Sequence, residues 1–179
     1  MSVTLFPERQ AMQDESDQVI ACIPRLRRYA RALVGERGTA DDLVQDTLER
    51  GWTKLASWRR GGDMRAWLFG IMHNLHVDQV RKRIVDTDVY DEHTAEMPTR
   101  ATQSDRLEIR DLDSALRQLP AEQREILLLV VLEEMTYDEV ATTLSIPLGT
   151  VMSRLSRARE KLRAVMEGRS VVSPLKVVK

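Results

Sequence analysis

The stretch MTYDEVATTLSIPLGTVMSRLSRAREKLR, residues 135–163, decides the fold of the C-terminal part of this chain. Thr136 and Glu139 have the spacing of a capping box, in which each side chain bonds the backbone N–H of the other residue, and this predicts a helix from there to Leu144. The segment SIPLG, residues 145–149, predicts a turn. A second helix is predicted to follow, so the stretch has the order of a helix-turn-helix.

The second helix of this stretch is amphipathic. Its predicted buried seam has spacings of four, three and four residues and consists of Val151, Leu155, Ala158 and Leu162. The seam turns a set of mostly polar side chains outward, namely Ser153, Arg154, Ser156, Arg157 and Glu160. Met152 has no evident place in the predicted core.

The outward face of this helix has the chemistry of a DNA-reading surface. Arginine can donate two hydrogen bonds to a guanine edge in the major groove, and serine or threonine can bond bases or phosphates. The N-terminal end of a helix also favours a nearby phosphate. The alternative is a solvated helix whose arginines only keep the protein soluble. Because a capped helix and a tight turn precede it, DNA binding is the favoured interpretation.

The residues before this stretch complete a small helical module. Apolar residues recur at helical spacing from about residue 106 to Pro120. The run ILLLVVL, residues 126–132, predicts a buried central helix within residues 121–134. No segment of the sequence alternates apolar and polar residues as a strand would. The predicted fold class is all-α, with two small helical domains joined by a flexible acidic linker.

Charge divides the chain into three parts, although the net charge of the whole is −1. Residues 1–83 hold 14 Lys and Arg against 11 Asp and Glu, and residues 106–179 hold 12 against 11. Residues 84–105 hold one Arg against six acids and show no periodicity, which predicts an acidic linker. The nearly neutral total therefore conceals two mildly basic modules, and local charge decides partners.

The N-terminal module is predicted to consist of a flexible segment and three helices, at residues 1–16, 17–34, 40–55 and 64–83. Pro24 is expected to kink or divide the first helix. Thr39 is the predicted N-cap of the second, with Asp41 and Asp42 favourably placed in its first turn. The stretch WRRGGDM, residues 58–64, predicts a turn.

Two segments of this module carry side chains suited to binding. The segment TADDLVQDTLERGW, residues 39–52, is either an ordinary amphipathic helix or a surface that a polar partner recognises through charge complementarity. The segment SWRRGGDMRAWLFGIMHNLHVDQVRKR, residues 57–83, combines aromatic side chains with cations. Opening a duplex requires a surface for an extruded base and cations along the strand. Trp67 and Phe69 are nonetheless expected to be mainly structural.

Composition argues against several other classes of function. The single cysteine, Cys22, permits no intrachain disulfide and is predicted to be a small core residue. His73 and His76 lie one turn apart without a third ligand at useful spacing, so no metal and no cofactor is predicted. No nucleophile–base or carboxylate pair stands in a recognisable motif, so no enzyme is expected. The longest apolar run is too short to cross a bilayer and no signal peptide is apparent, which predicts a cytoplasmic protein without membrane insertion.

The stretch 135–163 resembles the promoter-reading domain of the extracytoplasmic function (ECF) sigma factors, within the sigma-70 superfamily. Residues 39–52 resemble the segment by which sigma factors dock on RNA polymerase, and residues 57–83 resemble the element that opens and reads the −10 promoter region. The resemblance covers about residues 17–165 in the family's order, with no middle sigma domain between the modules. It implies sigma domain 2, a linker, sigma domain 4 and a flexible tail at residues 17–83, 84–105, 106–166 and 167–179.

This resemblance implies an alternative bacterial sigma factor that directs promoter-specific transcription initiation. Its expected partners are promoter DNA, the β′ clamp helices and β flap of core RNA polymerase, and an anti-sigma factor that controls it in a stress response. For the −35 element, the predicted base-reading residues are Ser153, Ser156 and Arg157, and the predicted phosphate contacts are Thr150, Arg154 and Arg159.

Residues are also predicted for the −10 element and for polymerase docking. By the resemblance, Asn74 matches the position that contacts a flipped base of the −10 element. Its expected cationic partners in melting are Arg59, Arg60, Arg65, Arg81 and Arg83. The docking surface is expected to contain Asp41, Asp42, Val44, Gln45, Asp46 and Arg50.

Two other functions are open at this stage. A conventional helix-turn-helix regulator would need a dimerisation or ligand-sensing segment, whereas the first module matches polymerase docking. A sigma-mimicking protein that sequesters an anti-sigma factor would not need cations on its reading helix. Arg154, Arg157 and Arg159 are present there, which favours a sigma factor.

Overall fold

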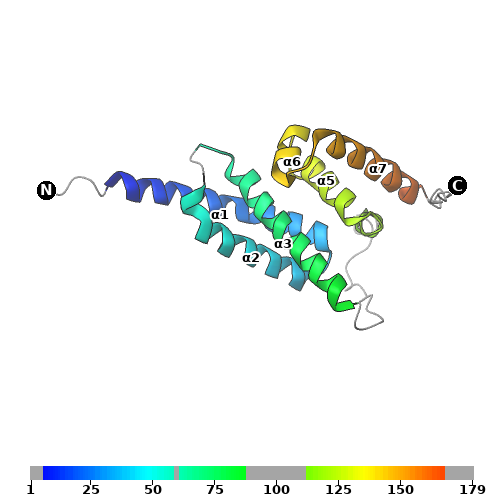
Figure 1. Ribbon diagram of the computed structural model, residues 1–179, viewed down its shortest axis with the longest axis horizontal. Helices are drawn as coiled ribbons and strands as arrows, with labels where there is room; N and C mark the ends of the chain where they lie inside the picture. Colours follow the sequence, from blue (N-terminus) through cyan, green and yellow to red (C-terminus); the bar gives the residue numbers. More distant parts are fainter. Residues whose placement is uncertain (1–5, 59–60, 88–111, 168–179) are drawn as a thin grey trace, which may run out of the picture. The chain divides into compact units, whose positions relative to one another are not determined.

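The computed structural model describes residues 6–58, 61–87 and 112–167 (Figure 1). In these ranges every regular element is a helix, which confirms the prediction of an all-α fold. The elements are α1 (Phe6–Val34), α2 (Arg37–Lys54), the 3-10 turn η1 (Leu55–Ser57), α3 (Met64–Thr87), a short helix at residues 112–117, α5 (Ala121–Val131), α6 (Tyr137–Leu144) and α7 (Leu148–Met166). The predicted DNA contacts Arg59 and Arg60, most of the predicted linker and most of the predicted tail lie outside the described residues.

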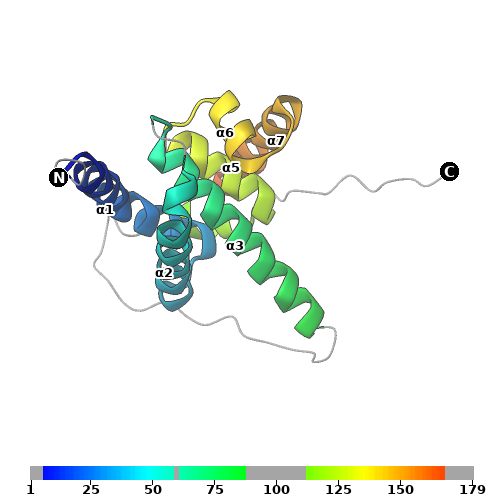
Figure 2. The ribbon, with the colours of Figure 1, turned by 60° about the vertical axis from the view of Figure 1, so that its left-hand side comes forward.

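The helices divide between two compact units. The first contains α1, α2, η1 and α3, and the second contains α5, most of α6, and α7. In the first unit α2 packs against both α1 and α3, and α1 also contacts α3 (Figure 2). Tyr29 of α1 and Phe69 of α3 meet edge to face with ring centroids 4.8 Å apart. The same core includes the fully buried side chains of Leu26, Leu33, Leu43, Leu68 and Met72.

Both α1 and α3 are longer than predicted. α1 begins at Phe6 and not at residue 17. The sequence of residues 6–16 shows no apolar periodicity, so this part of α1 has no local signal that predicts a helix. Pro24 is exposed and lies within α1 without dividing it. α3 extends to Thr87, beyond the predicted end at residue 83.

The start of α2 differs from the prediction. Glu36, and not Thr39, is the N-cap, because its carboxylate accepts hydrogen bonds from the backbone N–H of Gly38 at 2.6 Å and of Thr39 at 2.5 Å. The first turn of α2 therefore holds no acidic residue. Asp41 lies beyond that turn and forms exposed ion pairs with Arg37 at 3.8 Å and with Arg31 of α1 at 3.7 Å.

Gly51 allows α2 and α3 to approach closely. Gly51 is buried, and a Cβ added there would lie 2.9 Å from Cδ2 of Leu68, which is itself fully buried. Any larger residue would therefore force the two helices or the Leu68 side chain to move.

The second unit is held together by the packing of α5 against α7. α5 ends at Val131 rather than at the predicted residue 134, and Glu134 takes the left-handed conformation with φ 55° as the chain turns away. Arg124 of α5 caps the preceding helical segment, since its guanidinium donates to the carbonyls of Leu116 at 2.8 Å, Arg117 at 2.9 Å and Leu119 at 3.2 Å. Burial, and secondly the neighbouring Arg117, lowers the pKa of Arg124 below its ordinary value, with Asp113 acting in the opposite direction.

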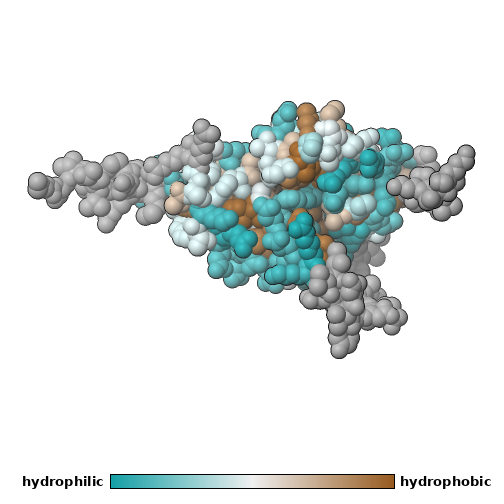
Figure 3. All heavy atoms as spheres, in the orientation of Figure 1, coloured by the Kyte–Doolittle hydropathy of each residue, from teal (hydrophilic) through white to brown (hydrophobic). Residues whose placement is uncertain are grey.

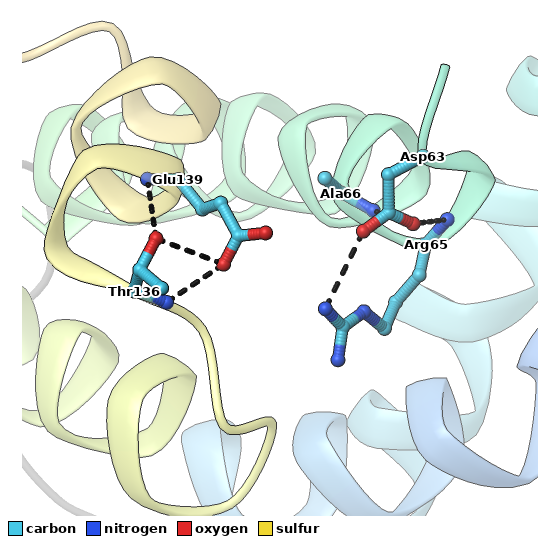
Figure 4. A network of polar contacts seen from close by, with 5 residues as sticks. All are labelled: Asp63, Arg65, Ala66, Thr136 and Glu139. Carbon is cyan, nitrogen blue, oxygen red and sulfur yellow. Dashed lines mark hydrogen bonds and ion pairs between the residues drawn. The ribbon is translucent and has the colours of Figure 1, made fainter. Parts of the chain in front are cut away.

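The helix-turn-helix is present and its capping box is confirmed. The backbone N–H of Thr136 donates to Glu139 Oε2 at 2.7 Å, and the N–H of Glu139 donates to Thr136 Oγ1 at 3.3 Å (Figure 4). The turn is shorter than predicted, because α6 ends at Leu144 and α7 begins at Leu148. Ser145 makes the turn with φ 53°, and the N–H of Ile146 returns to the carbonyl of Ala141 at 3.0 Å.

The surface of the described helices is mainly polar. The face shown in Figure 3 is largely hydrophilic, with apolar atoms visible in limited areas. Among the described residues, no helix has the length and apolar character needed to cross a bilayer.

Candidate nucleic-acid and polymerase interfaces

α7 has the two faces that its sequence predicts. Val151, Leu155 and Ala158 are buried and hold the helix against the rest of the unit, which confirms three members of the predicted seam. The fourth, Leu162, is half-buried. Three of the predicted DNA contacts are exposed, namely Ser156, Arg157 and Arg159.

The other three predicted DNA contacts of α7 are less accessible. Thr150 and Ser153 are half-buried, and the Ser153 hydroxyl donates to the Thr150 carbonyl at 3.1 Å. Arg154 forms an ion pair with Glu122 of α5, with 2.6 Å between Arg154 Nη2 and Glu122 Oε2. The carboxylate of Glu122 therefore already neutralises part of the charge that Arg154 could offer to a phosphate. Sequence reasoning missed this pair because no local spacing links residues of α5 and α7.

Two apolar side chains on α7 are also exposed. Leu148 is 40% and Met152 52% exposed, and they lie one turn apart in the N-terminal half of the helix. The sequence assigned neither of them to the core or to a contact with DNA.

α2 carries the predicted docking surface with one correction. Asp41, Asp42, Gln45, Asp46 and Arg50 are exposed. Val44 is only 4% exposed and packs inside the first unit, so its side chain is not available to a partner.

Trp52 is a prominent exposed residue of α2 that the predicted docking surface omitted. It is 56% exposed and lies two turns after the exposed Gln45, so the two residues share a face of the helix. The heptad spacing from Gln45 could have indicated this position. Exposed tryptophan is enriched among the residues that dominate binding at protein interfaces.

α3 presents part of the predicted −10 surface. Trp67, Asn74 and Arg81 follow one another at intervals of seven residues and so lie along one face of the helix. Asn74 and Arg81 are exposed and Trp67 is half-buried. The other two aromatic side chains of this region, Trp58 and Phe69, are buried.

Of the remaining cations of the −10 prediction, Arg65 is the one whose side chain is described, and it does not join this face. Arg65 is nine residues before Asn74, which places it on the opposite side of α3. Its guanidinium lies 3.4 Å from Asp63, whose other carboxylate oxygen caps α3 by accepting from the N–H of Arg65 at 2.8 Å and of Ala66 at 3.3 Å (Figure 4). The side chain of Arg83 lies outside the described residues.

The residues considered for metal binding do not form a cluster in the described part of the chain. His73 and His76 are half-buried on α3. No group of three or more His, Cys, Asp or Glu side chains that could hold a metal ion occurs among the described residues. Cys22 is half-buried on α1.

Comparison with known proteins identifies the family. Residues 19–73 match the family described as the sigma2 domain of PhyR, and residues 109–162 match sigma-70, region 4. The chain is 37% identical over 151 residues to the ECF RNA polymerase sigma factor EcfG of Rhodopseudomonas palustris, covering 84% of this chain and 83% of that relative. It is 34% identical to the ECF RNA polymerase sigma factor SigL of Mycobacterium tuberculosis, covering 79% and 82%.

Solved structures give the same result. The sigma factor RpoE in complex with the anti-sigma factor NepR from Bartonella quintana matches with a TM-score of 0.73 and 34% identity, over 87% of this chain and 98% of that one. CnrH in complex with the cytosolic domain of CnrY matches with a TM-score of 0.65 and 26% identity, over 89% and 91%. The chain belongs to the ECF RNA polymerase sigma factor family.

Proposed function

We propose that this protein is an alternative sigma factor that binds core RNA polymerase, directs it to a set of promoters and helps to open them. The observation that carries the proposal is the helix-turn-helix of a sigma-70 region 4, whose last helix exposes Ser156, Arg157 and Arg159. A factor of this kind is a non-catalytic subunit that acts in the cytoplasm, where the polymerase works.

In −35 recognition, some residues of α7 are assigned to bases and others to phosphates. Ser156 and Arg157 lie opposite the buried seam, where a major groove would receive them, and we assign them to bases together with Ser153. Arg159 lies at one flank of this face and Thr150 lies two turns before Arg157, near the N-terminal end of the helix, and both are assigned to phosphates. Arg154 is also assigned to phosphates, with part of its charge neutralised by Glu122.

The first unit supplies the other two activities. The α3 face that contains Trp67, Asn74 and Arg81 is suited to a single-stranded −10 element, because it combines an amide, a cation and a partly accessible aromatic ring. The exposed acidic face of α2 is assigned to the β′ clamp helices, with Trp52 as an additional contact. The β flap is assigned to the second unit.

An anti-sigma factor is the proposed regulator. Two of the matching structures are complexes, RpoE with the anti-sigma factor NepR and CnrH with the cytosolic domain of CnrY. By analogy, an anti-sigma factor would cover the polymerase-binding or DNA-binding surfaces of this chain and so act by occlusion. Its release under stress would restore polymerase binding.

One experiment tests the proposed function as a whole. The purified chain is used to capture core RNA polymerase, and the resulting complex is tested in run-off transcription on a library of promoter sequences. The expected result is a stoichiometric complex that starts transcription at promoters sharing −10 and −35 sequences. Failure to bind the core enzyme, or binding without any promoter selection, would contradict the proposal.

A sigma-mimicking role is the second candidate, and one observation favours it. The family that matches residues 19–73 is the sigma2 domain of PhyR, and the anti-anti-sigma factor PhyR in its complex with NepR from Bartonella quintana shares the fold at 18% identity. A mimic would bind an anti-sigma factor without supporting promoter-specific transcription. The exposed cations of α7 favour the sigma factor, and the same run-off assay separates the two roles.

A further inference from the structure

The exposed apolar pair Leu148 and Met152 lies on one flank of α7. The helix places 100° between successive residues, so Met152 lies between the buried seam and the outward Ser156. Leu148 lies one turn before Met152 on the same side. With 40% and 52% of their surfaces exposed, neither side chain is accounted for by the core of the unit.

The surroundings of this pair are those of a DNA contact. Ser156, Arg159 and Arg163 are exposed and continue the same flank toward the C-terminus. The one acidic residue of α7, Glu160, lies one turn after Ser156 and about 80° around the helix from Met152, so the cations lie nearer to the flank of Met152 than the acid does. A small apolar patch bordered by a hydroxyl and cations is better suited to a polyanion that carries an apolar group than to an apolar protein surface.

The bases of DNA offer one such feature in the major groove. Thymine alone carries a C5-methyl group there, and apolar side chains read it by direct contact. We infer that Met152, supported from behind by Leu148, contacts a thymine methyl group in the −35 element and so selects a T·A pair next to the base that Ser156 reads. This inference rests on the proposed function and adds a specificity residue to it.

The contribution of this contact to DNA affinity should not depend on salt concentration. A methionine at this position contributes apolar burial and no phosphate neutralisation, so its effect on DNA affinity should not change with ionic strength. Burial of one methyl-sized group corresponds to about a three- to fivefold change in affinity.

Deoxyuridine tests the inference directly, because it removes the methyl group of thymine and keeps its hydrogen-bonding edge. A −35 sequence is first selected from a random library with the holoenzyme. Each thymine of that sequence is then replaced in turn, and dissociation constants are measured for the holoenzyme carrying the wild-type chain or Met152→Gln. At one position, uracil should weaken wild-type binding about three- to fivefold and leave Met152→Gln unchanged.

Met166→Gln is the matched control. Met166 is on the same helix with the same 52% exposure, but it lies about 21 Å further along the axis. It should respond to uracil as the wild type does. Met152→Arg should lose the response to the methyl group and should steepen the dependence of affinity on salt by about one ion.

The outcomes separate the inference from the proposed function. If no −35 sequence is selected, the proposed function itself fails. If a sequence is selected but uracil has the same effect on wild type and Met152→Gln at every position, the thymine contact is wrong. It is equally wrong if the selected −35 element contains no thymine.

Discussion

The three arginines in the middle of α7 have different environments although they are close in sequence. Arg157 and Arg159 are exposed, whereas Arg154 is paired with Glu122 at 2.6 Å. An exposed guanidinium on the outward face is placed to approach a base edge, whereas that of Arg159, nearer to the buried seam, is placed to approach a phosphate. These different environments therefore assign different roles to three side chains of the same type.

Arg157 and Arg159 should respond differently to truncation. Arg157→Ala should cost about 1–3 kcal/mol at the preferred promoter and relax the choice of base at one −35 position, because a base contact is lost. Arg159→Ala should weaken binding to all promoters alike and reduce the salt slope by about one. Holoenzyme affinities for a promoter series at several salt concentrations measure both effects. A uniform loss with Arg157→Ala would show that it binds the backbone.

Glu122 should restrain DNA binding through Arg154. Glu122→Gln removes the charge that neutralises Arg154, so affinity for any duplex should rise and its salt slope should steepen by up to about one. Glu134→Gln makes the same change of charge at another exposed position of the second unit and serves as the control. Equal effects of the two substitutions would mean that only net charge matters and that the ion pair has no specific role.

At the scale of the element, the ends of the helices are fixed by side chains from several sources. Glu36 caps α2, Asp63 caps α3, and Thr136 with Glu139 caps α6. Arg124 closes the segment that precedes α5 by bonding three carbonyls. These contacts decide where each helix begins and ends, and so where its functional face points.

Loss of the Arg124 cap should destabilise the second unit. Arg124→Met keeps the apolar stem and removes the donors to three carbonyls, so the free energy of unfolding should fall by about 2 kcal/mol. Arg117→Met removes an exposed pair with Asp113 and should cost less than about 1 kcal/mol. Chemical denaturation followed by circular dichroism compares the two. Similar losses would contradict a special role for the cap.

Two glycines on helices should tolerate a side chain differently. Gly51→Val places new atoms against the buried Leu68, and overpacking of this kind destabilises by about 1–3 kcal/mol. Gly149→Val meets nothing within 4 Å of the added Cβ, so the stability should change by less than about 0.5 kcal/mol. Melting of the two variants followed by circular dichroism tests this. An unchanged melting curve for Gly51→Val would mean that α2 and α3 are not in close contact.

Sequence predicts these elements where the signal is local and fails where it is not. The capping box and the seam of α7 follow from spacings of three and four residues, and both are present. The burial of Val44 depends on which face of α2 meets another helix, which no local pattern records, and the first residues of α1 lack the apolar periodicity that would signal a helix. The N-cap of α2 is Glu36 and not the predicted Thr39, and glutamate is not among the residues preferred at an N-cap.

The whole molecule distributes its proposed activities between two units with separate cores. Polymerase docking and the −10 element fall on the first unit and −35 recognition on the second. The order of these activities could be predicted from the sequence, since each rests on a contiguous segment. Contacts between distant segments, such as Arg154 with Glu122, could not, because 31 residues separate the two positions.

Replacement of Trp52 should affect polymerase binding and not recognition of the −35 element. Trp52→Ala should weaken binding to core polymerase by about 2 kcal/mol or more if it anchors the interface, and should leave recognition of the −35 element unchanged. Ile20→Ala is the control, because Ile20 is 59% exposed on α1 of the same unit. Titration of labelled core enzyme with each variant measures the difference. No loss with Trp52→Ala would remove the residue from the docking surface.

The close approach at Gly51 has a mechanical consequence. α2 and α3 touch there without a spacer, and tightly packed interiors have low compressibility. Under the proposed assignment, α2 binds the polymerase and α3 opens the promoter, so the two helices would move as one rigid body. A shift of the polymerase surface beneath α2 would then be transmitted to Asn74 with little slack, so clamp movement and strand separation would proceed in step.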